Sequence, residues 1–312
     1  MLALFHDPRF RLGGLTRRGH GAVKLVLAQC MQRRFNLAQR EDLEAYLNHN
    51  TSLSEAPNNW QPFPEPKKAP SSDKLITATI PFQPEGYWMF GGGHDDTHQA
   101  DMAPVTGTRI QWDEKGSGHP VQGYLIPATG IKGALAHRLA FHYNALTGIF
   151  ADRVPLEELK NHTGSENSAV SALFGQACED DHGHRGHVLI DDLFIPDGDK
   201  PKDQLVHHVA IDRFTGGARA GALFTERPFW QGPEATKLAI TLTWPQDAPL
   251  DEKMKAAWGR TLQDLAEGHL QVGAGSGRGH GYLQPTRVQW HPPTADQEFF
   301  PDTPDPKKTA AP

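Results

Sequence analysis

Apolar positions in the first part of the chain alternate and repeat in ways that predict three elements. Residues 23–27 alternate in the manner of a strand, and residues 40–47 read as a helix because Leu43 and Leu47 lie four positions apart. Residues 75–82 are rich in β-branched side chains, which favour a strand. Between residues 47 and 75 the apolar positions follow neither a helix nor a strand periodicity.

The chain after residue 120 predicts a mixed succession of helices and strands. A helix over 131–143 has one apolar face and a possible cap in Thr129. A short helix is expected over 169–174, and Gly268 ends an amphipathic helix over 250–265. Strands are expected over 121–126, 187–194, 207–211, 222–224, 237–244 and 286–290, and a polar loop is expected over 91–120.

Composition divides this pattern into four parts. Residues 53–73 hold five prolines and read as a linker, and residues 293–312 are too polar and proline-rich to join a core, so they read as a disordered tail. Residues 74–292 carry the order β-α-β-β-α-β with long insertions, which indicates an α+β, ferredoxin-like unit. Residues 1–52 form a separate N-terminal part.

A short repeat links the two ends of the chain. The sequence Arg-Gly-His-Gly stands at residues 18–21 and again at 278–281. Upstream, Gly13 matches Gly273 and Thr16 matches Ser276 without a gap, and a strand is expected after each copy. We interpret this as a duplication. Because about ten residues precede the first copy, residues 1–52 correspond to the C-terminal part of an incomplete unit.

Charge narrows the place where a nucleic acid could bind. The net charge is −6, from 31 basic and 37 acidic side chains, whereas a nucleic-acid binder usually has a basic excess. A binding surface must therefore be local. Two windows contain bases and no acid: residues 8–40, with eight Arg or Lys, and residues 115–151, with Lys115, Lys132 and Arg138.

The cysteine content and the hydropathy of the chain indicate the cellular compartment of the protein. Cys30 and Cys178 are far apart and form no disulfide framework, which favours reduced thiols. No apolar run has the length of a membrane span, and Met1–Leu4 is too short for the core of a signal peptide. We expect a cytoplasmic protein with no membrane contact.

Three groups of basic residues suit an anion, and each has a structural alternative. Glycine-rich loops let a phosphate approach backbone N–H groups, and Arg278, Arg17 and Arg18 add charge there, although a tight turn with an exposed arginine explains them equally well. Lys132 follows the start of a predicted helix, where a phosphate or an ordinary cap would fit. Arg138 falls on the apolar face of that helix and needs a partner, either a carboxylate or a phosphate.

Acidic and histidine side chains raise the question of a metal. The expected loop 91–120 contains Asp95, Asp96, Asp101 and Asp113, with His94 and His98 nearby. Taken alone, each reads as an exposed loop residue. A second group of possible zinc ligands, whose spacing fits no standard zinc signature, comprises Cys178, His182, His184 and His187, and a solvated loop is the preferred interpretation.

Four motifs in order resemble those of the RAMP superfamily. Residues 127–135 (PATGIKGAL) resemble its PGSSLKGALR segment, and LFG at 173–175 with GHVLIDD at 186–192 resembles its next motif. IDRFTGGA at 211–218 with GALF at 221–224 resembles the segment written iDR.TG.A..G.LF. GAGSGRGHG at 273–281 resembles the terminal glycine-rich loop. The third motif favours the backbone subunits of type III CRISPR effector complexes.

The resemblance implies a fold, partners and a reaction. The fold would be a ferredoxin-like or RRM-like βαββαβ RAMP domain with long inserted loops and a thumb hairpin that crosses the guide–target duplex. The partners would be a guide RNA (crRNA), a target RNA and other CRISPR effector subunits, in antiviral defence. RNA contacts would come from the following residues: Lys132, Arg138, Arg213, Arg278, Gly277, Gly279, Arg17 and Arg18. Asp212 is expected to hold the turn beside Arg213, as a buried pair with it, and Phe214 and Phe224 favour core positions.

The resemblance also implies metal-dependent cleavage of the target RNA. Relatives need one loop aspartate before a Pro-Val pair, and Asp101 precedes Pro104-Val105 with one extra residue. Asp101 is therefore the expected catalytic residue and ligand of a divalent cation, magnesium. The sequence departs from the family pattern at 127–129 and at His280. Residues 1–52 have no counterpart in a single-domain subunit and suggest a fused or multi-domain version. The alternatives are an inactive structural RNA-binding subunit and a metal-independent endoribonuclease that processes guide precursors with a histidine base.

Overall fold

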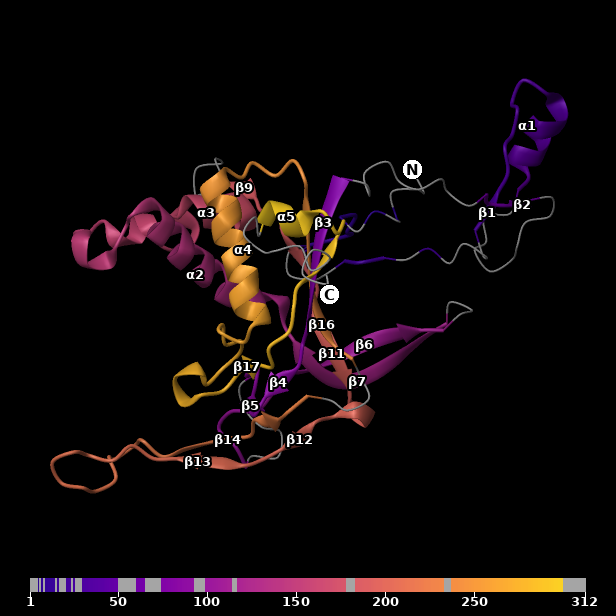
Figure 1. Ribbon diagram of the computed structural model, residues 1–312. Helices are drawn as coiled ribbons and strands as arrows, with labels where there is room; N and C mark the ends of the chain where they lie inside the picture. Colours follow the sequence, from indigo (N-terminus) through magenta and orange to yellow (C-terminus); the bar gives the residue numbers. More distant parts are fainter. Residues whose placement is uncertain are drawn as a thin grey trace, which may run out of the picture.

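A mixed α+β body carries two long projections (Figure 1). The computed structural model describes residues 30–49, 60–64, 74–92, 99–113, 117–177, 183–232 and 237–299, and before residue 30 it describes residues 5, 7, 9–14, 16, 21–23 and 25. No helix in this described part of the chain is long and apolar enough to cross a membrane.

A four-stranded antiparallel sheet forms the centre of the body. Its strands lie in the order β10 (Leu189–Ile190), β16 (Ala239–Pro245), β3 (Leu75–Pro81) and β18 (Gln289–His291). On β3, Ile76, Ala78 and Ile80 are buried while the threonines between them are only half-buried, because side chains alternate across a strand. In chain order, helices connect β3 to β10 and β16 to β18.

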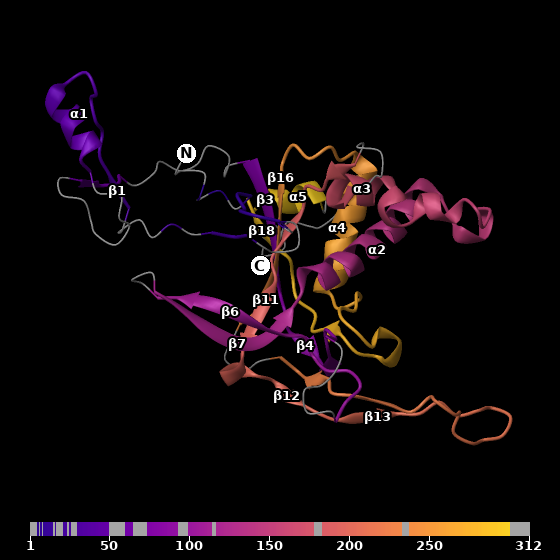
Figure 2. The ribbon, with the colours of Figure 1, turned by 180° about the vertical axis from the view of Figure 1, so that it is seen from behind.

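Three helices cover one face of this sheet (Figures 1 and 2). They are α2 (Ala128–Thr147), α3 (Ser168–Phe174) and α4 (Glu252–Ala266). Leu135 and Leu139 of α2 join Trp258 and Leu262 of α4 in the core. The Asp251 side chain accepts a hydrogen bond from the Met254 N–H at the start of α4. Gly268, with φ of +78°, follows its end as the sequence predicts.

The segment after Pro292 corrects one expectation. Residues 295–299, assigned above to a disordered tail, form the short helix α5 (Ala295–Phe299), and Ala295 and Phe299 are buried. The Phe299 ring stacks on Trp290 with centroids 5.3 Å apart, and a Cβ on Gly259 of α4 would meet the Phe299 carbonyl oxygen. The buried Phe299 side chain therefore holds this polar segment against α4.

The expected loop 91–120 is also partly wrong, because it contains a long strand. Strand β6 (Thr106–Trp112) pairs with β7 (Gly118–Ile126), which pairs in turn with β11 (Leu193–Pro196). The strand expected over 187–194 is divided between β10 in the central sheet and β11 here. Asp192, between them, accepts a hydrogen bond from the first N–H of α2 at 2.6 Å.

The thumb hairpin, which we define as β13 (Val206–His208), β14 (Phe224–Glu226) and the chain between them, projects from the body (Figure 1). Phe214 at its turn is 99% exposed, so the expected core position of that residue is wrong. Beside the hairpin, β12 (Lys202–Asp203), β15 (Phe229–Trp230) and β5 (Tyr87–Trp88) form a second small sheet. Phe224, by contrast, is partly buried.

Short elements complete the body. The strands are β4 (Pro84–Glu85) with β17 (Tyr282–Leu283), and β8 (Gly175–Gln176) with β9 (His184–Arg185). The 3-10 helices are Ala151–Arg153, Leu159–His162, Gly164–Glu166, Asp197–Asp199 and Ser276–Arg278.

In the N-terminal part, α1 (Arg40–Leu47) confirms the predicted helix. Strand β1 (Met31–Gln32) pairs with β2 (Gln61–Pro62), so two residues of the proposed linker belong to a sheet. These elements lie apart from the body in both ribbon views (Figures 1 and 2). The expected strand over 23–27 falls largely outside the described residues.

Candidate nucleic-acid interface

Strand β14 brings the predicted catalytic aspartate to the base of the thumb hairpin. The Thr225 N–H donates to Asp101 Oδ2 at 2.7 Å, and the Asp101 N–H donates to the Thr225 carbonyl oxygen at 2.8 Å. Met102 forms a bridge with Glu226, and the Arg227 N–H donates to the Met102 carbonyl oxygen at 2.9 Å. Asp101 itself is exposed. Its carboxylate is thus held in place by backbone and remains accessible.

The same strand holds the predicted RNA-binding arginine of the terminal loop. Glu226 is fully buried, and the Arg278 guanidinium donates to its Oε2 at 2.6 Å. The guanidinium also lies over the Phe224 ring, 5.2 Å from the centroid. Phe224 and Glu226 share one face of β14 because they are two residues apart. Asp101 and Arg278, far apart in the sequence, are both fixed by one short strand.

Two histidines complete what we name the Glu226 cluster, which consists of Glu226, Arg278, His208 and His280. The His208 Nε2 lies 2.8 Å from Glu226 Oε1, and the His208 ring stacks on Phe224. The His280 Nδ1 lies 3.5 Å from the same carboxylate oxygen. Burial is the largest effect and lowers the pKa of His280; the Glu226 carboxylate opposes it, and Arg278 and His208 add to it. Burial therefore favours a neutral imidazole at His280.

Glycines set the path of residues 272–281, which we name the C-terminal glycine loop. Gly273, Gly275, Gly279 and Gly281 all have φ between +82° and +89°, a region that side chains disfavour. The loop is tied to the body where the Ala274 N–H donates to the Met89 carbonyl oxygen at 2.7 Å. Gly277 and Gly279 are exposed at the outer turn, as a phosphate contact would require.

The turn of the thumb hairpin is held by Asp212. Its Oδ1 accepts hydrogen bonds from the N–H groups of Phe214 and Thr215, at 2.9 Å and 2.8 Å. The backbone hydrogen bonds from Thr215 and Phe214 and the Thr215 hydroxyl lower the pKa of Asp212. Asp212 thus holds the turn as expected, but through backbone N–H groups at the surface rather than in a buried pair with Arg213. Arg213 is exposed in the same turn.

The start of α2 differs from its sequence-based description. Pro127 is the N-cap residue and Thr129 lies inside the helix, so the predicted Thr129 cap is wrong. The first helical N–H, that of Ala128, already donates to the Asp192 carboxylate. The Lys132 ammonium donates to the Phe174 carbonyl oxygen at 3.1 Å. Lys132 therefore joins α2 to the end of α3, and phosphate binding there stays a prediction.

Arg138 has a carboxylate partner. Its Nε donates to Asp264 Oδ2 at 2.5 Å, and the His142 Nε2 lies 2.6 Å from the same oxygen. Asp264 belongs to α4, so this group joins α2 and α4. Of the two partners weighed for Arg138, the structure supplies the carboxylate, and RNA contact by Arg138 stays a prediction.

The carboxylate of Asp101 is the group to consider for a metal ion. No group of three His, Cys, Asp or Glu suited to a metal ion occurs among the residues that the structure describes. Asp101 Oδ2 accepts a hydrogen bond from the Thr225 N–H. Among the described residues Oδ1 has no hydrogen-bond partner, so it is the oxygen available to a cation. Mg²⁺ commonly binds one or two carboxylates together with substrate phosphates, so a cation shared with RNA fits this single carboxylate. Of the possible zinc ligands, the His184 Nε2 lies 2.9 Å from the Ser171 carbonyl oxygen, whereas Cys178 and His182 are outside the described residues.

Several predicted residues cannot be placed. Arg17, Arg18, His94, Asp95, Asp96 and His98 lie outside the described residues. Sequence reasoning missed Glu226 and His208. The sequence signal for Glu226 was its position two residues after Phe224, which puts both side chains on one face of a strand. Spacing along the strand predicts the shared face, but only folding brings residues 208, 226 and 278 together.

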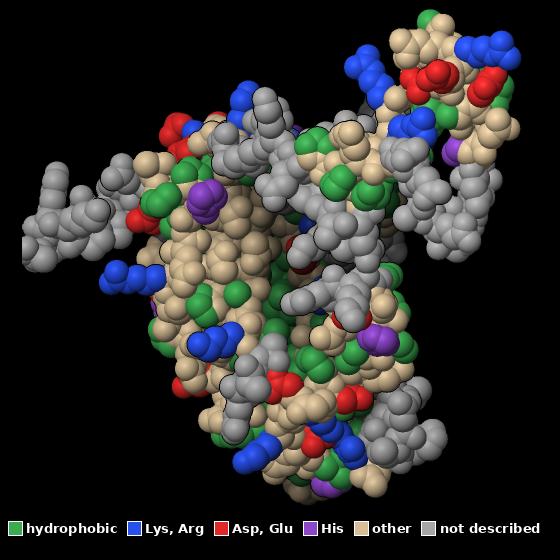
Figure 3. Space-filling model, turned by 90° about the vertical axis from the view of Figure 1, so that its right-hand side faces the viewer, with side chains coloured by type: hydrophobic (Ala, Val, Ile, Leu, Met, Phe, Trp, Pro, Cys, Tyr) green, Lys and Arg blue, Asp and Glu red, His purple; other side chains and the backbone are tan. Residues whose placement is uncertain are grey.

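Charge on the surface agrees with a local interface. On the face shown in Figure 3, Lys and Arg side chains are scattered among Asp and Glu instead of forming one continuous basic face. This matches the net charge of −6. Contacts with an RNA backbone would therefore have to come from particular loops.

Comparison with models of known protein families places the chain in a family. A family model described as the RAMP superfamily matches residues 85–284, which is more than half of the 312 residues. The matched range includes Asp101, the thumb hairpin and the C-terminal glycine loop. A search of curated proteins found no match.

Proposed function

The chain belongs to the RAMP superfamily, and on that premise we propose that it is a guide-RNA-binding backbone subunit of a type III CRISPR effector complex. In this proposal it cleaves the bound target RNA in a metal-dependent reaction, as part of antiviral defence. Membership of the superfamily by itself supports the coarser statement, a CRISPR-associated RNA-binding function.

The observation that carries the proposal is the joint attachment of Asp101 and the C-terminal glycine loop to β14. Asp101 is hydrogen-bonded to Thr225, and Arg278 to the neighbouring Glu226. The Asp101 carboxylate, proposed to act in cleavage, and the C-terminal glycine loop, proposed to bind the RNA backbone, are thus both attached at the base of the projecting hairpin. That is the arrangement a subunit would need if the hairpin crossed a guide–target duplex.

The arrangement of the sheet supports a ferredoxin-like RAMP domain. Elements β3, α2, β10, β16, α4 and β18 follow one another in the order β-α-β-β-α-β. All neighbouring strands of the sheet are antiparallel, with β3 and β16 in the middle. The insertions between these elements supply Asp101 and the thumb hairpin.

In this proposal one set of residues binds the RNA, and Asp101 acts in its cleavage. The proposed RNA contacts, to guide or target, are Gly277, Gly279, Arg278, Lys132, Arg213, Arg138, Arg17 and Arg18. The exposed Asp101 carboxylate would orient the 2′-hydroxyl of the target for attack on the adjacent phosphate. A divalent cation, magnesium, held by Asp101 and the RNA, would neutralise charge that develops on the phosphate.

The test is the Asp101→Ala variant in the assembled complex, with labelled target RNA, in magnesium and in chelator. We expect binding to persist and cleavage to stop, because one carboxylate acts on the transition state whereas affinity is spread along the duplex. Asp113→Ala is a matched control, because Asp113 accepts the Ser117 N–H within the β6–β7 turn.

Other outcomes identify the alternatives. A wild-type complex that binds and never cuts would be a structural subunit. Cleavage that continues in chelator would indicate a metal-independent endoribonuclease. If Asp95→Ala or Asp96→Ala abolishes cutting and Asp101→Ala does not, the loop is correct and the residue is wrong.

A further inference from the structure

Asp101 shares its anchor with an exposed histidine. Thr225 donates its N–H to Asp101 Oδ2 at 2.7 Å, and its hydroxyl oxygen lies 3.0 Å from the His207 Nδ1. His207 lies directly opposite Thr225 in the β13–β14 pairing. The two ionisable side chains are therefore bound to the same residue, one through its backbone and one through its side chain.

The contact with Thr225 fixes which nitrogen of the imidazole remains available. Nδ1 is engaged by the hydroxyl, so Nε2, on the far side of the ring, is the nitrogen left for a substrate. His207 and Asp101 are both exposed. An imidazole that is oriented through one nitrogen and accessible through the other meets the geometric requirement for proton transfer.

The neighbouring histidine has a different environment. His208 points to the opposite face of the hairpin, where its Nε2 lies 2.8 Å from the buried Glu226 and its ring stacks on Phe224. That side chain is committed to the Glu226 cluster. Alternation along β13 thus gives one histidine a structural position and leaves the other beside Asp101.

We propose that His207 is the general acid of target RNA cleavage, donating a proton from Nε2 to the 5′-oxygen that leaves. This inference rests on the proposed function. In the step, the 2′-hydroxyl, oriented by Asp101, gives its proton to solvent water as its oxygen forms a bond to phosphorus. The bond from phosphorus to the 5′-oxygen breaks, and that oxygen takes the His207 proton. The products are a 2′,3′-cyclic phosphate and a 5′-hydroxyl.

The experiment measures single-turnover cleavage by the assembled complex with two target RNAs. One is the ordinary target, and the other has sulfur in place of the 5′-bridging oxygen at the scissile phosphate. A thiolate leaves without protonation, so the second target does not need a general acid. His207→Asn is the test variant, because its amide can still contact Thr225, and His119→Ala, at an exposed histidine on β7, is the control.

We expect His207→Asn to slow cleavage of the ordinary target by about 10²- to 10⁴-fold, the usual contribution of general acid–base catalysis. It should cut the sulfur-containing target within a few-fold of the wild-type rate, whereas Asp101→Ala should fail on both. An equal loss on both targets would show that His207 only maintains the hairpin and would overturn the proposal.

Different results would refute the role of His207 and the proposed function. Normal cleavage of the ordinary target by His207→Asn overturns the general acid and leaves the proposed function in place. A wild-type complex that binds and cuts neither target overturns the proposed cleavage, and the role of His207 with it.

Discussion

Two glycine loops, one near each end of the chain, share a closing hydrogen bond and two glycine conformations but have different surroundings. The N-terminal glycine loop, residues 12–21, closes where the Leu12 N–H donates to the Gly21 carbonyl oxygen at 2.9 Å. In the C-terminal glycine loop the equivalent bond runs from the Val272 N–H to the Gly281 carbonyl oxygen, at 3.0 Å. All four bonded residues occupy matching positions of the repeat.

The glycines of the two loops match as well. Gly13 and Gly273 have φ of +83° and +89°, and Gly21 and Gly281 have φ of +80° and +82°. A Cβ on Gly21 would clash with the Leu12 carbonyl oxygen, as one on Gly281 would with that of Val272. This agreement supports the duplication inferred from the sequence.

The partners of the loops differ. The C-terminal loop has its arginine on the fully buried Glu226 and its histidine buried beside the same carboxylate. The N-terminal loop is joined to two exposed residues of the body, Asp191 and Arg185. The Arg11 guanidinium donates to Asp191 at 2.8 Å, and Arg185 donates to the Thr16 hydroxyl at 2.7 Å. Glycine spacing thus determines the loop path, while the surrounding fold determines what the charges bind.

The largest expected difference between the loops concerns their ion pairs. Arg278→Ala leaves the Glu226 carboxylate buried with only histidine partners. We expect it to lower the free energy of unfolding by up to about 3 kcal/mol, the low end for a broken buried pair, because Arg278 is partly exposed. The Arg11 side chain is only 7% exposed, but Arg11→Ala leaves no buried charge because Asp191 is half-exposed and stays hydrated, so the lost ion pair should cost about 1 kcal/mol or less. Urea unfolding of the full chain measures both.

The double variant Arg278→Ala/Glu226→Gln serves as a control, because it removes the stranded charge and should recover part of the loss. Equal effects of Arg278→Ala and Arg11→Ala would contradict the contrast between the loops. A large effect of Arg278→Ala also means that its RNA affinity must be measured under conditions where the variant is folded.

A smaller difference is expected for the closing glycines. Gly281→Ala forces a side chain into a backbone region that costs about 1–3 kcal/mol and into a clash with Val272. Gly21→Ala creates the same local strain. Its loop can open without the core, so the melting temperature of the body should change much less. Calorimetry of the two variants tests this, and a similar loss for both would show that the loops are equally integrated in the fold.

For RNA binding, the N-terminal glycine loop should contribute more to the salt dependence than the C-terminal glycine loop. Arg17 and Arg18 are outside the described residues, and the repeat assigns them to the loop that does not include the Glu226 cluster. Replacing both with Ala should reduce the slope of log affinity against log salt by about 2, roughly one unit for each lost phosphate contact. Lys132→Ala should reduce it by about 1. Arg278→Ala should change it less, because Glu226 already balances that charge.

Filter binding at several salt concentrations gives these slopes. If Arg278→Ala lowers the slope as much as the Arg17/Arg18 pair does, the guanidinium leaves Glu226 when RNA binds. Slopes that no variant changes would argue against RNA contact by either loop.

The smallest expected effect is on pH dependence. The pKa of His280 is lowered in the folded chain, so the unfolded chain binds a proton at higher pH than the folded one. Stability should therefore fall as the pH drops below about 6.5, the ordinary value for histidine. His280→Asn should show a shallower fall. Thermal melts between about pH 7 and pH 5.5 compare the two, and parallel curves would mean that His280 is charged in the fold.

Much of the fold could be predicted from local patterns, because periodicity reports which face of an element is buried. The strand over 75–82, the helix over 40–47 and the stop at Gly268 were all confirmed to within a residue or two. The misses arose where long-range contacts override local preference. Phe299 binds a polar tail segment to the core, and β6 forms only because β7 pairs with it.

The candidate site was predictable only in its separate parts. Motifs indicated Asp101 and Arg278. Nothing in the sequence showed that both are hydrogen-bonded to β14, or that Glu226, His208 and His207 lie near them. Likewise, the sequence could say that Arg138 needs a partner and could not say that Asp264, 126 residues away, supplies it.

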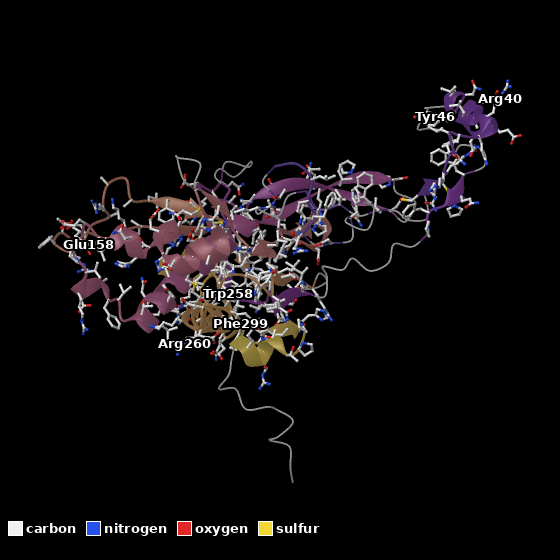
Figure 4. All side chains as sticks on the ribbon, turned by 90° about the horizontal axis from the view of Figure 1, so that it is seen from above. Arg40, Tyr46, Glu158, Trp258, Arg260 and Phe299 are labelled. Atoms are coloured by element: carbon white, nitrogen blue, oxygen red, sulfur yellow. The ribbon has the colours of Figure 1, made fainter. Side chains whose placement is uncertain are left out.

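Local sequence patterns determined the helices and strands with clear periodicity, such as 40–47 and 75–82, together with the glycine positions of the turns and the residues that carry charge. These properties depend on contacts within a few residues. The tertiary structure alone decided how charges are paired and which aromatic residues are buried, as with Trp258 and Phe299, which lie close together at α4 and α5 (Figure 4). Those outcomes depend on surfaces that meet only when the chain is compact, because hydration and Coulomb energies are set by every neighbour at once.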